Sequence, residues 1–154
     1  MKAIVKTAAG PGHVETQEVP RPVPKAGELL VAVKATGTCG TDVLLYDWTY
    51  KGRKPVVPPI ILGHEGAGEV VEIGPGVQGF KPGDRVGLEA LIGCGRCYYC
   101  AQGNTHLCRD WAHLGISFGG TFAEYLTIPA TAAHLLPDGV SYLDGAFLEP
   151  IAII

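Results

Sequence analysis

The chain has 154 residues, with 12 Lys and Arg against 15 Asp and Glu, and a formal net charge of −3. Apolar residues make up 47% of it, which is enough to bury a core and excludes a disordered chain. The acidic excess argues against a nucleic-acid partner, and apolar runs such as residues 29–33 are too short to span a membrane. Because Lys6 interrupts the stretch that a signal peptide keeps apolar, we expect a cytoplasmic protein.

The first half of the chain reads as short strands with one helix. Its 22 glycines and 12 prolines, counted over the whole chain, favour strands and turns over a helix bundle. Apolar side chains at positions 43, 44, 45 and 48 predict a short helix over residues 39–48, before a Pro- and Lys-rich loop over residues 51–59. The predicted strands cover residues 2–6, 14–19, 28–34, 69–73 and 85–88.

The second half begins with a cysteine-rich lobe over residues 93–110. Period-two alternation predicts a strand over residues 121–128, and another strand follows over residues 133–136. Ser141 is placed to cap a final helix, with Asp144 at the third position after it. The apolar end over residues 148–154 is unusual for a natural terminus, so we expect a fragment cut before a second domain.

Four of the five cysteines form the pattern C-x2-C-x2-C-x7-C. In a reducing compartment such clustering indicates metal ligation before disulfides, and four thiolates suit a closed, structural zinc site. Glycines in the lobe allow the loop to fold tightly enough for backbone N–H groups to reach the sulfurs. Four unligated thiols and an iron–sulfur cluster are the alternatives. The cysteines are Cys94, Cys97, Cys100 and Cys108.

A second, open metal site is a weaker inference from the residues alone. Cys39 and His64, together with a carboxylate, would give zinc three ligands and leave one position for water or substrate. Such a site acts as a Lewis acid and acidifies a bound hydroxyl group. A Cys and a His 25 residues apart are, on spacing alone, more often core residues.

One glycine motif does not carry function. Residues 74–79 match G-x-G-x-x-G, but the Pro and Gly that follow would break the helix that a dinucleotide fingerprint must open. We interpret the segment as a turn between strands and predict no nucleotide site in this chain. Four histidines have no partner pattern and are assigned surface or core roles: His13, His106, His113 and His134.

A family resemblance then emerges from the motifs. The pattern Gly63-His64-Glu65-x2-Gly68-x5-Gly74-x2-Val77 resembles the signature of zinc-containing medium-chain alcohol dehydrogenases. The four-cysteine lobe is similar to the structural zinc loop of that family, and residues 39–42 resemble its first catalytic-ligand segment. Residues 81–86 and 122–125 are also family-like, so the similarity covers nearly the whole chain in family order.

The resemblance implies a fold and a domain organisation. We expect a mainly β, GroES-like β-barrel with a protruding structural zinc lobe and a few short helices, forming the catalytic domain over residues 1–154. In the family a Rossmann domain that binds NAD or NADP follows, and that domain is absent from this sequence. We therefore expect the isolated chain to show little or no turnover.

The resemblance also implies a ligand set for a catalytic zinc, the second of two zinc ions per chain. Cys39 and His64 would bind it, and Glu65 would be a direct or exchangeable ligand. Glu149, in a Leu-Glu-Pro sequence, falls where the family places its last ligand and resembles the polyol and threonine dehydrogenase branches. A solvated acid is the alternative role of Glu149.

Two further side chains take roles by resemblance. Thr41 would hydrogen-bond the alcohol and begin proton release, and Asp42 would orient His64 through the other ring nitrogen. A helix N-cap is the alternative role of both residues. The threonine dehydrogenase branch typically has His where this sequence has Leu44 and Leu91, which weighs against threonine because leucine neither relays a proton nor hydrogen-bonds a substrate.

The implied reaction is hydride transfer from a secondary alcohol, polyol or threonine-like substrate to a nicotinamide. The partner is thus a small-molecule alcohol, and a homo-oligomer is left open. The alternative from another class is a stand-alone zinc-binding module whose catalytic residues are vestigial. A zinc-free quinone-reductase branch is disfavoured because it generally lacks the ligands present here.

Overall fold

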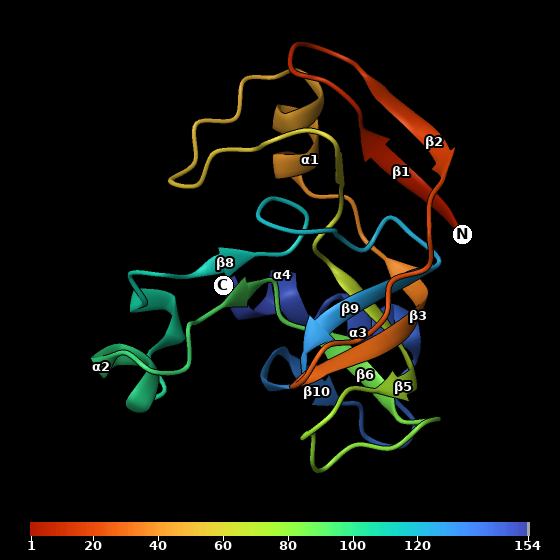
Figure 1. Ribbon diagram of the computed structural model, residues 1–154, viewed down its shortest axis with the longest axis vertical. Helices are drawn as coiled ribbons and strands as arrows, with labels where there is room; N and C mark the ends of the chain where they lie inside the picture. The colour runs from red at the N-terminus through yellow and green to blue at the C-terminus, as the bar shows by residue number, and fades with distance from the viewer. Residues whose placement is uncertain (154) are drawn as a thin grey trace.

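The computed structural model describes residues 1–153, and residue 154, the end of the apolar C-terminal run, lies outside them. Short antiparallel strands dominate the chain, with short helices between and after them (Figure 1). The strands are β1 Lys2–Lys6, β2 Val14–Glu18, β3 Glu28–Thr36, β4 Ile60–Ile61, β5 Gly66–Ile73, β6 Arg85–Leu88, β7 Leu91–Ile92, β8 Ala112–His113, β9 Tyr125–Pro129 and β10 Ala133–Leu135. The helices are α1 Gly40–Tyr46, α2 Tyr98–Ala101, α3 Tyr142–Ala146 and α4 Leu148–Ile153, with 3-10 turns η1 Thr105–Leu107 and η2 Ala130–Ala132.

A five-stranded antiparallel sheet, in the order β10-β6-β5-β3-β9, is the centre of the fold. In its strand β3, Leu29, Leu30 and Val31 are completely buried, so both faces of this strand are covered. The pairing of β3 with β5 shifts register after Leu30 and again after Val33. Such bulges bend and twist a strand pair, and the sheet curls accordingly.

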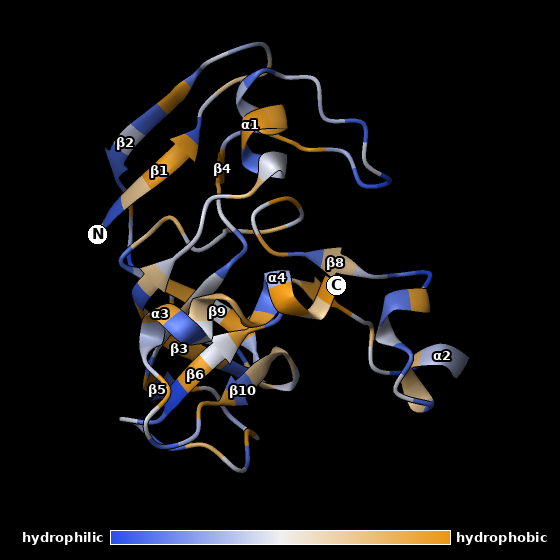
Figure 2. Cartoon of the chain, turned by 180° about the vertical axis from the view of Figure 1, so that it is seen from behind, coloured by the Kyte–Doolittle hydropathy of each residue, from blue (hydrophilic) through white to orange (hydrophobic). Residues whose placement is uncertain are grey.

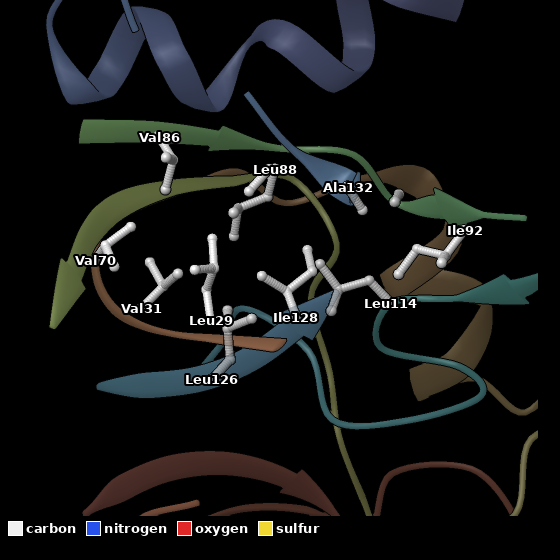
Figure 3. Packing of buried hydrophobic residues seen from close by; sticks show 12 residues of the cluster. Leu29, Val31, Val70, Val86, Leu88, Ile92, Leu114, Leu126, Ile128 and Ala132 are labelled. Atoms are coloured by element: carbon white, nitrogen blue, oxygen red, sulfur yellow. The ribbon is translucent and has the colours of Figure 1, made fainter. Parts of the chain in front are cut away.

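The main core lies inside this curl (Figure 3). Val86 and Leu88 on β6 face Leu29 and Val31 on β3, with Ile128 on the adjacent β9. Helix α3 packs against β3, β5 and β6 on the other side. The sequence prediction of a mainly β architecture with short helices is confirmed.

A smaller sheet, in the order β2-β1-β4, carries the N-terminal strands and contacts a second apolar cluster. In that cluster the one fully buried apolar side chain of α1, Leu45, packs with Ile60, Leu62 and Ile116. Figure 1 shows α1 beside this sheet, at the opposite end of the molecule from β10. The cluster therefore anchors α1 to β4, and the segment that follows β4 carries His64.

The cysteine lobe projects from the side of the molecule in both views (Figures 1 and 2). Its base is the two-stranded pair β7-β8, in which Leu91 lies opposite His113 and Ile92 opposite Ala112. Helix α2 and turn η1 form its tip. Within residues 1–153, none of the helices has the length and apolar character that crossing a membrane requires.

Several predicted elements differ from the structure at their bounds. Helix α1 ends at Tyr46, because Trp48 adopts a φ of 58° and cannot continue a right-handed helix. The strand predicted over residues 121–128 begins only at Tyr125, since the N–H groups of Thr121 and Phe122 donate instead to Gly63 and Leu62. Residues 74–79 form turns without a helix, which confirms the turn interpretation of the glycine motif. Strands β4, β7 and β8 and helices α2 and α4 were not predicted.

Candidate metal centres

Three of the predicted ligands of the open site converge. Cys39 immediately precedes α1, whereas His64 and Glu65 lie in the short segment between β4 and β5. One ligand atom from each of these residues lies within 4.8 Å of the other two, so that one cation can contact all three. His64 is 3% exposed, while Cys39 and Glu65 are half-buried. This mixed set of sulfur, nitrogen and oxygen atoms matches the donors that zinc accepts in open sites.

The local backbone at this site depends on glycine. Gly63 adopts a φ of 88°, and a Cβ atom there would lie 2.4 Å from the ring of Phe122. The Gly63 carbonyl also accepts the N–H of Thr121 at 3.0 Å. Because glycine has no side chain, residue 63 can adopt this φ and lie directly against Phe122. The tight turn that results places the His64 ring in the interior.

Asp42 serves both the helix and the site. Its Oδ2 atom accepts the backbone N–H of Cys39 at 2.9 Å, which satisfies the first turn of α1. Its Oδ1 atom lies 3.8 Å from Nδ1 of His64, an ion-pair distance that is longer than a hydrogen bond. The alternative N-cap role of Thr41 or Asp42 is wrong, because Cys39 is the N-cap; Asp42 is the third helical residue, whose carboxylate completes the capping box and also lies beside His64.

Three buried polar atoms in the described residues have no hydrogen-bond partner: Asp42 Oδ1, His64 Nδ1 and Glu149 Oε2. Burial lowers the pKa of His64, opposed by the charge of Asp42 and reinforced by His113. A neutral imidazole is the form that binds a metal. Unpaired buried polar atoms are costly, so the unpartnered Glu149 oxygen fits a position near a cation, whereas the other two atoms face each other.

Glu149 reaches the same region from α4. Burial, and next the charge of Glu65, raise the pKa of Glu149 above its usual range. The two carboxylates are therefore neighbours in the fold although 84 residues separate them in the sequence. Glu149 is half-buried and its Oε2 atom is buried without a partner, which weighs against the alternative role of a solvated acid. Glu149 does not belong to the group of atoms within 4.8 Å, which contains Cys39, His64 and Glu65.

Thr41 lies in the first turn of α1, with its hydroxyl 3.8 Å from the sulfur of Cys39. Its side chain is half-buried. The hydroxyl is thus held beside the candidate ligands without being one of them.

His113 was missed by the sequence analysis. Its ring centroid lies 5.1 Å from that of His64 in an edge-to-face arrangement, and Trp111 packs on it at 6.2 Å. Its Nδ1–H donates to the carbonyl of Leu114 at 2.7 Å, because a carbonyl can only accept. Burial lowers the pKa of His113. The spacing of His113 in the sequence gives no signal, since the pairing of β7 with β8 creates the contact.

The four lobe cysteines form the second cluster, with one sulfur from each within 4.8 Å of the others. Backbone N–H groups point at two of these sulfurs: Cys94 donates to Cys108 at 3.3 Å and Cys100 donates to Cys97 at 3.5 Å. The backbone N–H of Arg96 lowers the pKa of Cys94 to about 7, whereas burial raises that of Cys100 to about 11. The predicted approach of backbone N–H groups to the sulfurs is confirmed, and the four-sulfur set fits a closed zinc site.

The comparisons with known proteins agree with this geometry. Residues 25–138 match the family described as "Alcohol dehydrogenase GroES-like domain", and the chain belongs to this family. A sorbitol dehydrogenase of Halalkalibacterium halodurans is 44% identical over 99% of this chain, and an L-threonine 3-dehydrogenase of Pyrococcus horikoshii is 48% identical over 98%. The chain covers 43% of the length of each of these relatives.

A solved structure gives the same result for the fold. A protein of Sinorhizobium meliloti, described as a zinc-binding dehydrogenase bound to NADP, superposes with a TM-score of 0.87 at 39% identity. The match covers 98% of this chain and 42% of that protein. The GroES-like fold expected from the sequence motifs is therefore confirmed.

Proposed function

We propose that this chain is the catalytic domain of a zinc-dependent dehydrogenase that oxidises secondary alcohols, polyols or threonine-like substrates with NAD or NADP. The observation that supports it best is the convergence of Cys39, His64 and Glu65 within 4.8 Å, beside a separate four-cysteine cluster. One open and one closed candidate site is the combination expected of a catalytic zinc and a structural zinc. The nicotinamide would bind to a further domain, because this chain covers 43% of its curated relatives.

The residues fit the metal. Cys39, His64 and the carboxylate of either Glu65 or Glu149 would hold the catalytic zinc, and a bound zinc supplies Lewis acidity that makes an alcohol hydroxyl easier to deprotonate. The buried, unpartnered oxygen of Glu149 supports this assignment, since a nearby cation would offset its burial beside Glu65. Cys94, Cys97, Cys100 and Cys108 would hold the structural zinc.

Two side chains of this chain would orient a metal ligand and transfer the proton of the substrate. Asp42 would fix the orientation of the His64 ring across the 3.8 Å contact and would favour a proton on Nδ1, the ring nitrogen that faces it. Thr41 would accept a hydrogen bond from the substrate hydroxyl and pass its proton outward. Leu44 is 45% exposed and apolar, so the next acceptor on this route would be water. Oxidation removes this proton and, from the carbinol carbon, a hydride that the nicotinamide takes up.

Kinetics test the proposal. The zinc-loaded 154-residue chain should give no measurable NAD+ or NADP+ reduction with secondary alcohols and polyols, while the natural protein containing this chain and its cofactor domain should turn over. Thr41→Ala in that protein should lower kcat by about 10²-fold, the low end for a lost acid–base group. Absence of turnover in the natural protein would favour the stand-alone zinc-binding module instead, whereas turnover that Thr41→Ala leaves unaffected would contradict the proton route through Thr41.

A further inference from the structure

The loop between α1 and β4 carries an unpaired cluster of positive charge. Lys51, Arg53 and Lys54 fall within four residues of a chain whose net charge is −3. None of the three forms an ion pair in the part of the chain that the structure describes. Lys51 and Arg53 are exposed, and Lys54 is half-buried. The loop extends on the same side of the molecule as β8 in both views (Figures 1 and 2).

Aromatic contacts connect this loop to the open metal site. The Lys54 ammonium lies 5.5 Å from the centre of the Trp111 ring. The Trp111 ring packs on His113 at 6.2 Å, and His113 packs on His64 at 5.1 Å. Trp111 is 9% exposed, so its position is fixed by packing. A cation held over such a ring has a defined place, unlike a lysine that moves freely in solvent.

A hollow lies beneath the same loop. It has a volume of about 230 Å³, and Trp48, Tyr50 and Lys54 line it together with Gly52. The Lys6 ammonium lies 5.1 Å from the ring of Trp48, but it is completely buried and donates to backbone carbonyls, so Lys54 is the cation that lines the hollow. Aromatic walls with one lining cation, Lys54, and no neutralising carboxylate among the lining residues favour an anionic ligand group.

We propose that Lys54, with Lys51 and Arg53, binds an anionic group of the substrate, so that the preferred substrate is an alcohol bearing a phosphate or carboxylate remote from the reacting hydroxyl. This inference rests on the proposed function, because His64 defines where the reacting hydroxyl lies. An anion would relieve the mutual repulsion of three cations within four residues. The ring contacts from Lys54 through Trp111 and His113 place Lys54 in the same side-chain cluster as His64, so the anionic group and the reacting hydroxyl would belong to one substrate.

The two tryptophans of the chain are natural probes, because Trp48 lines the hollow and Trp111 lies under Lys54. The zinc-loaded, ¹⁵N-labelled chain is titrated separately with a hexitol, its phosphate ester, the matching aldonate, inorganic phosphate and NADP+, while both indole N–H signals are followed. We expect the ester or the aldonate to shift these signals with a Kd at least about tenfold below that of the hexitol, as one charge-assisted hydrogen bond provides. Equal Kd values for the hexitol and both anionic forms would overturn the proposal.

Variants of the loop sharpen the test. Lys54→Gln should remove most of the tenfold preference and Arg53→Gln part of it, whereas Lys81→Gln, at an exposed turn, should leave it intact. An unchanged preference in Lys54→Gln would overturn the proposal, as would inorganic phosphate or NADP+ binding as tightly as the ester. Zinc content is measured on the same samples. Two zinc ions per chain without an anion preference mean that this inference alone fails, whereas a missing second zinc means that the proposed function fails.

Discussion

His64 and Asp42 face each other across 3.8 Å at a position where both side chains are at most 5% exposed. The two atoms that form this contact have no other partner in the described residues. Asp42 is fixed from the other side by the N–H of Cys39, so one carboxylate connects two of the candidate ligands. The carboxylate therefore fixes the Cys39 backbone and faces the His64 ring before any metal binds.

Replacing Asp42 tests this connection. Asp42→Asn keeps an oxygen for the Cys39 N–H but removes the charge that faces His64, so we expect zinc affinity at the open site to fall by about 10- to 100-fold. Competition with a chelator of known affinity measures the change. Asp47→Asn, at the C-terminal end of the same helix, is the control and should bind zinc as the wild type does. Equal affinities of all three proteins would contradict the role of Asp42.

The four-cysteine lobe should depend on its metal. It contributes few buried apolar side chains of its own, since none of the residues of α2 or η1 is buried. Cys94→Ala should therefore lose one zinc and make the lobe sensitive to limited proteolysis, while the open site keeps its own zinc. Cys39→Ala provides the reciprocal variant, in which the lobe stays resistant. Cleavage at equal rates in Cys94→Ala and the wild type would count against a structural zinc.

Lys6 is a completely buried lysine without a carboxylate partner. Its ammonium donates to the carbonyls of Gly10, Gly12 and Tyr46, and it thereby fixes the C-terminal end of α1. Lys6→Met should lower the free energy of unfolding by about 2 kcal/mol, because three backbone carbonyls lose a charged donor. Lys2→Met, on the same strand but exposed, should change it by less than about 0.5 kcal/mol. Denaturant unfolding that ranks the two variants equally would contradict this role.

The capping box of α3 makes a pH-dependent contribution. The Ser141 hydroxyl, and next its backbone N–H, hold the pKa of Asp144 below its usual value. Because the folded-state pKa is depressed, this stabilisation is present above about pH 4 and is lost as the pH falls through the folded-state value. Ser141→Ala should lower Tm by a few degrees at pH 7, and the difference should narrow below about pH 3. Thermal melts at both pH values measure it, and a difference that widens in acid would be the opposite result.

The sequence was informative where a pattern repeats over several residues. The strands of four residues or more were recognised, although the one predicted by period-two alternation begins only at Tyr125. The capping box at Ser141 and the spacing of the four cysteines were also recognised, because local rules specify them. Strands β4, β7 and β8 have two residues each, too few for any periodicity to appear. They exist through pairing with distant segments, as in Lys6 with Ile60.

At the open site, too, the residues in sequence motifs were predicted, and those brought together by pairing of distant segments were not. Cys39, His64 and Glu65 were predicted through the resemblance of motifs, and the fold brings them together. His113 was not, because it meets His64 only after β7 and β8 pair at the base of the lobe. The same pairing places Trp111 beside His113 and beneath Lys54, a contact between loops 57 residues apart that no local pattern encodes.

The zinc content of the purified chain tests the central claim most directly. After zinc loading and dialysis, elemental analysis should give two zinc ions per chain for the wild type and one for each of Cys39→Ala and His64→Ala, with the four-cysteine site still filled. A cobalt-substituted sample should show the same loss in the thiolate-to-metal absorption assigned to the open site. One zinc per wild-type chain, unchanged by Cys39→Ala and His64→Ala, would contradict the account.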